Sequence, residues 1–148
     1  MYFETRKMKD LYLWAGNVHG GPSAKFLVQQ VRPMRDLRFT GNCLLGSRPI
    51  LSFDHSFDES PTLGILKRLL GDIFAPPKGH PKSKPFHDHV LSFSALEGRV
   101  LVRHYQLIPA DPHVRGDEAS LVEIGPRFAL VPIRVLSGCF QGETLFTN

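Results

Sequence analysis

Hydrophobic residues recur with a helical period in one stretch of the sequence. The stripe consists of Leu63, Leu66, Leu69, Leu70, Ile73 and Phe74, spaced mainly by three or four residues. Ser60 is a favourable N-cap residue, Pro61 suits the first position of a helix, and Pro76-Pro77 ends it. The pattern therefore predicts an amphipathic helix that begins after Ser60 and packs one face on a sheet.

Shorter runs that alternate, or that are bounded by glycine and proline, predict β-strands. They cover residues 2–4, 24–31, 49–53, 89–96, 99–108 and 120–124. Glu97-Gly98 predicts a tight hairpin between the fourth and fifth of these runs. The apolar run 128–136 stays ambiguous, because Pro132 disfavours both a long helix and a central strand. With about six or seven strands and one clear helix, we expect an α+β protein with a mostly antiparallel mixed sheet and few helices.

The length and composition favour one folded unit. Leu, Ile, Val and Phe make up 46 of the 148 residues, well above the fraction typical of disordered chains. The longest stretch without Asp, Glu, Lys or Arg, 11–24, is too short to span a membrane, and residues 1–7 do not resemble a secretory signal. Cys43 and Cys139 are too few for a disulfide scaffold, so reduced thiols in an intracellular compartment are favoured.

Basic residues concentrate in the first third of the chain. Residues 1–48 contain eight Lys or Arg against three Asp or Glu, in a chain of formal net charge +4. This asymmetry suggests a polyanionic partner, and a solvated surface is the alternative. Arginine offers a planar fork for phosphate and a face that stacks on bases. The candidate contacts are Lys25, Arg32, Arg35, Arg38, Arg48 and Arg127.

Motifs for catalysis are weak. The segment Gly20-Gly21-Pro22-Ser23-Ala24-Lys25 lacks the Gly-Lys-Ser/Thr end of a nucleotide-binding loop, and Lys25 leads into a predicted strand. The sequence contains no Gly-x-Ser-x-Gly elbow and no Cys-His pair at a recognisable spacing. Nucleophilic catalysis therefore has no support in the sequence.

A metal-dependent enzyme is also considered, with Asp54, Asp58, Glu59, His87 and His89 as candidate ligands. The carboxylates precede the predicted helix, where its N-terminal dipole explains them more simply. His87 and His89 lie two residues apart on one face of a predicted strand, which permits joint metal contact without requiring it. We expect no metal and no cofactor.

Several motifs together resemble the Brix-domain family of ribosome biogenesis factors. They are Gly21-Pro22-Ser23-Ala24-Lys25-Phe26; Thr40-Gly41-Asn42-Cys43 with Gly46-Ser47-Arg48-Pro49 and Leu51-Ser52-Phe53-Asp54; His80-Pro81-Lys82-Ser83-Lys84-Pro85-Phe86 with Asp88-His89-Val90; and Leu121-Val122-Glu123-Ile124-Gly125-Pro126-Arg127-Phe128. Together they span most of the chain.

This resemblance implies a non-catalytic nucleolar protein that binds precursor ribosomal RNA during assembly of the large ribosomal subunit. It implies a fold similar to the anticodon-binding domain of class II aminoacyl-tRNA synthetases. It also implies a second assembly factor as partner, with no membrane and no small-molecule substrate. Because the chain begins about where the family's second strand would lie, we expect residues 1–148 to be a single Brix domain lacking the family's N-terminal strand and helix.

Two questions stay open at this point. A protein-interaction scaffold within a pre-ribosomal particle, with incidental RNA contact, is the alternative function, and its partner would use a sheet edge or an apolar groove. Strand alternation points Arg127 away from the face that takes Phe128, so its guanidinium is available to a phosphate or to a carboxylate such as Glu123.

Overall fold

The computed structural model describes residues 1–7, 9–75, 87–111, 113 and 118–148. Within these residues the chain forms nine strands and two α-helices, which confirms the expected α+β class. The strands are β1 (Tyr2–Arg6), β2 (Asp10–Gly16), β3 (Ser23–Arg32), β4 (Pro49–Phe53), β5 (His89–Leu96), β6 (Arg99–Ile108), β7 (Ser120–Glu123), β8 (Arg127–Leu136) and β9 (Thr144–Thr147). The helical elements are the 3-10 turn η1 (Met34–Asp36), α1 (Ser56–Glu59) and α2 (Pro61–Phe74). The strand count exceeds the expected six or seven, partly because the sequence pattern does not predict β9.

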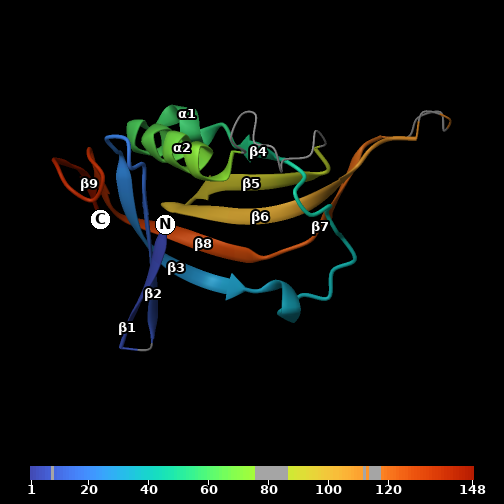
Figure 1. The fold of residues 1–148 in the computed structure, drawn as a ribbon, viewed down its shortest axis with the longest axis horizontal. Helices are drawn as coiled ribbons and strands as arrows, with labels where there is room; N and C mark the ends of the chain where they lie inside the picture. The colour runs from blue at the N-terminus through green and yellow to red at the C-terminus, as the bar shows by residue number, and fades with distance from the viewer. Residues whose placement is uncertain (8, 76–86, 112, 114–117) are drawn as a thin grey trace.

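All nine strands belong to one sheet. Its main path runs β1-β2-β3-β8-β6-β5-β4, with β7 beside β6 and β9 beside β8 (Figure 1). The pairs are antiparallel except for β4 and β5, which run parallel. The segment that contains α1 and α2 connects these two strands, as a parallel pair requires. The predicted mixed, mostly antiparallel sheet is confirmed.

The β5–β6 hairpin forms as the sequence predicts. Glu97 and Gly98 both have positive φ, 49° and 73°. Such a two-residue turn matches the right-handed twist of the strands that it joins. It sets Leu96 opposite Arg99 and fixes the register of both strands.

Pro132 lies in a central strand, one of the two elements that a proline disfavours, which settles the type of the ambiguous run 128–136. On one side of β8, pairing with β6 ends at Leu130 and pairing with β9 begins at Arg134. On the other side, the register with β3 shifts between Lys25 and Phe26, and Phe26 lies opposite Pro132. The proline thus occupies an interruption of the regular ladder, where a residue without an amide hydrogen is tolerated.

Helix α2 begins at the predicted residue and ends at Phe74, before the predicted stop. Ser60 occupies the N-cap position, but its side chain makes no capping hydrogen bond, so the role expected of its hydroxyl is wrong. Pro76-Pro77, which the sequence predicts to end this helix, lies outside the described residues. No helix in the described ranges is long and apolar enough to cross a membrane.

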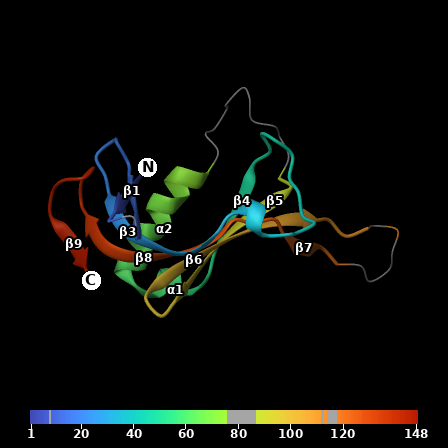
Figure 2. The same cartoon turned by 90° about the horizontal axis from the view of Figure 1, so that it is seen from below.

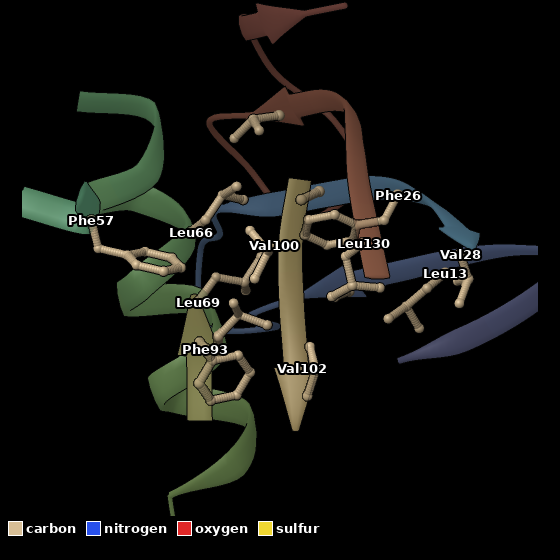
Figure 3. Packing of buried hydrophobic residues seen from close by; sticks show 14 residues of the cluster. Leu13, Phe26, Val28, Phe57, Leu66, Leu69, Phe93, Val100, Val102 and Leu130 are labelled. Atoms are coloured by element: carbon tan, nitrogen blue, oxygen red, sulfur yellow. The ribbon is translucent and has the colours of Figure 1, made fainter. Parts of the chain in front are cut away.

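The hydrophobic core lies between the two α-helices and one face of the sheet (Figure 3). Phe57 of α1 and Leu66 and Leu69 of α2 pack in the same cluster as Phe93 of β5 and Val100 of β6. Both α-helices therefore cover the same face, which we call the core face. The opposite face of the sheet is called the open face below. Figure 2 shows β9 at one end of the sheet and β7 at the other.

A candidate nucleic-acid interface on the open face

Basic side chains on the open face come from strands β3, β6 and β8. Lys25 lies opposite Arg134, and Arg32 lies opposite Arg127, across the β3–β8 pair. The residues on either side of Lys25 are buried in the core, so alternation turns Lys25 to the open face. Arg103 follows the buried Val102 and has the same orientation. Strand pairing thus brings together cations that are about 100 residues apart in the sequence.

Three of these arginines surround one hollow. Its volume is about 490 Å³, and its lining residues are Gln30, Val31, Arg32, Leu101, Val102, Arg103, Arg127 and Phe128. No acidic residue belongs to this lining. A concave surface with several guanidinium groups attracts anions, and its shape raises their local concentration.

Glu123 of β7 fixes the geometry of two of the arginines. Arg127 donates from Nε and Nη2 to the two carboxylate oxygens, at 2.6 Å and 2.7 Å. Nη1 of Arg103 lies 3.7 Å from the same carboxylate. The hydrogen bonds with Glu123 raise the pKa of the Arg127 guanidinium, which stays charged. The sequence offered Arg127 either a phosphate or a carboxylate such as Glu123, and the structure pairs it with Glu123. One acid shared by two arginines leaves a net positive charge at the hollow.

Phe39 supports the same arginine from another side. The guanidinium carbon of Arg127 lies 5.0 Å from the centre of the Phe39 ring, a cation–π distance. Gly125 has a φ of +81°, and a Cβ there would lie 2.9 Å from Cδ1 of Leu37. The Gly-Pro-Arg-Phe block thus positions Arg127 between β7, β8 and the segment after η1.

Lys25 belongs to a separate aromatic part of the open face. Its Nζ lies 4.6 Å from the ring centre of Tyr12 and 4.8 Å from that of Trp14. It also lies 3.5 Å from a carboxylate oxygen of Glu4. Tyr2, which is 50% exposed, stacks on Trp14 with ring centres 6.1 Å apart. Lys25 is therefore held by internal contacts, next to exposed aromatic rings.

The other predicted basic residues do not line the hollow. Arg35, whose side chain is 87% exposed, lies in η1 and 3.5 Å from Asp36. Arg38 is exposed in the segment that leads from η1 to β4, and Arg48, at the end of that segment, is partly buried. The structure thus groups Arg32 and Arg127 at the hollow, adds Arg103 to them, and places Arg134 opposite Lys25. Sequence reasoning missed Arg103 and Arg134 because only the strand register reveals them.

The residues considered for a metal enzyme have different neighbours. Asp54 accepts a hydrogen bond from the Ala95 amide at 2.7 Å. Asp58 pairs with Lys67 at 2.7 Å, and a Glu59 oxygen lies 3.8 Å from His55. His87 is exposed before β5, whereas His89 is buried. A common site of these carboxylates and histidines is therefore not assembled among the described residues.

Comparison with known proteins shows the family to which the chain belongs. A family model described as the Brix domain matches residues 1–134. The chain belongs to the Brix-domain family, and the resemblance inferred from its motifs is confirmed.

Particular relatives carry the name Ribosome biogenesis protein BRX1 homolog. The chain is 51% identical over 148 residues to the Homo sapiens protein and 45% identical over 150 residues to the Drosophila melanogaster protein. It is 47% identical over 154 residues to BRX1 homolog 1 of Arabidopsis thaliana. Each match covers the whole chain, which spans 40%, 40% and 49% of these relatives, respectively.

Proposed function

We propose that this chain is the RNA-contacting part of a non-catalytic ribosome biogenesis factor. On this proposal, its open face binds precursor ribosomal RNA during assembly of the large ribosomal subunit, in the nucleolus and beside another assembly factor. The names of the relatives, which are ribosome biogenesis proteins, support a role in ribosome assembly. The hollow surrounded by Arg32, Arg103 and Arg127 supports contact with RNA.

The chemistry of the open face suits a folded or single-stranded RNA. Guanidinium groups bind phosphate oxygens in a bidentate manner. At the β1–β2 end, Tyr2 and Phe140 are 50% and 42% exposed and lie against Trp14. Aromatic rings provide stacking platforms for unpaired bases. Phosphate contacts at the hollow and base stacking near Tyr2 are therefore assigned to one continuous face.

Substitutions at the hollow test this function. Arg103→Ala and Arg32→Ala should each weaken binding of the chain to a structured fragment of precursor large-subunit RNA. Each should also reduce the slope of log affinity against log salt concentration by about one, because one phosphate contact is lost. Glu123 keeps its bidentate partner Arg127 in both variants, so thermal unfolding should stay near that of the parent chain.

Arg68→Ala is the matched control. Arg68 is exposed on α2, on the side of the sheet opposite the hollow. Removing its charge should leave the affinity for RNA, and the dependence of that affinity on salt concentration, unchanged. If the two hollow variants bind RNA as the Arg68 variant does, the open face is not the RNA surface.

An apolar hollow supports the second candidate, a protein-interaction scaffold. It has a volume of about 190 Å³, and its lining residues are Phe3, Leu11, Leu13, Val28, Val31, Pro33, Pro126, Phe128 and Leu130. An apolar peptide segment would suit this lining. A chain that binds no RNA at low salt, yet binds an assembly factor through Phe3, would favour the scaffold.

A further inference from the structure

Cys43, His89 and His104 meet at the far end of the sheet from β9. They come from the segment before β4, from the first residue of β5 and from β6. One ligand atom from each residue, the thiol sulfur or a ring nitrogen, lies within 4.8 Å of the other two. The two histidine rings are 5.0 Å apart between centres and inclined at 75°. No other group of three potential ligands with this spacing occurs among the described residues.

Hydrogen bonds determine which ring nitrogens are available. Nδ1 of His104 lies 3.0 Å from the carbonyl oxygen of Gly125. A carbonyl oxygen only accepts, so Nδ1 carries the proton and Nε2 keeps its lone pair. Nδ1 of His89 lies 2.7 Å from a carboxylate oxygen of Asp88, with the same consequence. Metal-bound histidines are commonly oriented in this way, by a carbonyl or carboxylate that accepts from the other nitrogen.

The backbone on both sides of Cys43 is attached to the sheet. The Asn42 amide donates to the side-chain oxygen of Gln106 at 2.8 Å, and the Leu44 amide donates to Asp88 at 2.7 Å. His89 is 8% exposed, and Cys43 is partly buried. Cys43 is thus held beside the two histidines by backbone hydrogen bonds on both sides.

We propose that Cys43, His89 and His104 bind a zinc ion through the sulfur and the two Nε2 atoms. Zn²⁺ prefers sulfur and imidazole nitrogen in a tetrahedral arrangement. Its bond lengths of about 2.0–2.3 Å require ligand atoms about 3.3–3.7 Å apart, so these side chains would move closer together on binding the ion. Three protein ligands leave the fourth position to water or to a group from a binding partner. The ion would join the β3–β4 connection to strands β5 and β6.

The test uses the complete 148-residue chain, reduced and treated with chelator, and titrated first with Co²⁺ and then with Zn²⁺. One equivalent of Co²⁺ should produce the visible bands of a tetrahedral site and a thiolate-to-cobalt charge-transfer band. Zn²⁺ should displace the cobalt. A folded chain that yields neither band, and that retains less than one equivalent of zinc after dialysis, overturns the proposal.

The second cysteine provides a matched control. Cys139→Ser leaves Cys43 as the single thiol of the chain. The thiolate-to-cobalt band of this variant should therefore be the same as that of the parent chain. Cys43→Ser and His104→Gln should lose that spectrum and at least tenfold in cobalt affinity, whereas His55→Gln, at an 87% exposed side chain, should not. If the Cys43 variant fails to fold, the Cys139 variant decides: absence of the band there contradicts the proposal.

Discussion

Trp14 is an internal reporter for the ionisation of Glu4. Its indole nitrogen donates to Oε2 of Glu4 at 3.0 Å, and Nζ of Lys25 lies 3.5 Å from the same oxygen. The hydrogen bond from Trp14, with the nearby positive charge of Lys25, holds the pKa of Glu4 below its ordinary value of 4.5. Trp14 is the only tryptophan of the chain, so its fluorescence comes from one environment.

Acid titration should therefore change Trp14 fluorescence with a midpoint below pH 4.5. The folded state favours the Glu4 anion, so this contact stabilises the fold above the unfolded-state pKa and is lost as pH falls through the folded-state pKa. Intrinsic fluorescence of the folded chain measures the midpoint, and Glu4→Gln should abolish the transition. A midpoint at or above 4.5, or the same transition in the Gln variant, would contradict this assignment.

Individual site residues were predictable to different degrees. Arg32 and Arg127 were found because they flank proline and glycine signals that mark the ends of strands. Arg103 lies in the middle of a strand, where its charge resembles that of any solvent-facing residue until β6 is paired with β8. His104 is equally inconspicuous in the sequence, and its approach to Cys43 depends on the path of the β3–β4 connection.

At the scale of elements, the turn before β3 is packed against the turn between β8 and β9. Ser23 is fully buried; its hydroxyl donates to the Gly138 carbonyl at 2.6 Å and accepts from the Phe140 amide at 2.8 Å. A Cβ on Gly21 would lie 2.6 Å from backbone atoms of Gly138. Gly20 has a similar positive φ, but no atom lies within 4 Å of its Cβ position.

Gly21→Ala should therefore destabilise the chain more than Gly20→Ala. Both substitutions incur backbone strain, about 1–2 kcal/mol for a side chain at positive φ. Only Gly21→Ala also forces the backbone at residue 21 away from that of Gly138, which should lower the free energy of unfolding by about 1–3 kcal/mol more. Urea unfolding of the two variants measures the difference. Equal losses would show that the contact with Gly138 is not maintained in solution.

Elements defined by local signals were predicted, and those defined by distant partners were not. The β5–β6 hairpin follows from Glu97-Gly98, and α2 follows from its apolar stripe. Strand β8 was ambiguous because Pro132 is acceptable there only through a change of neighbour from β6 to β9. Strand β9 has four residues and no turn signal of its own strong enough to predict it.

At the scale of the molecule, the sheet has a protected centre and exposed margins. Strands β2, β3, β5, β6 and β8 have neighbours on both sides, whereas β1 and β4 each pair with one strand. Four of the five residues of β1 are exposed. Amide groups in strands with a neighbour on each side open only with larger parts of the structure.

Hydrogen exchange should accordingly be slow in β3, β5, β6 and β8 and much faster in β1. Mass spectrometry of peptides from the exchanged chain measures this order. Dilution provides the control, because protection that comes from within one chain is independent of concentration. Slow exchange in β1 that disappears on dilution would instead indicate pairing of its edge with a second copy, as in the scaffold hypothesis.

The pairing of β3 with β8 also determines the order in which the sheet can assemble while the chain is being synthesised. Ser23 of β3 lies opposite Leu136 of β8, so the central pair closes a loop that contains most of the chain. A ribosome makes the N-terminal residues first, and β3 therefore has one unpaired edge until β8 has emerged. Contacts of such long sequence separation are entropically costly and slow to form. Strand β8, which is made more than 100 residues after β3 begins, is thus the strand that joins β1, β2 and β3 to the rest of the sheet.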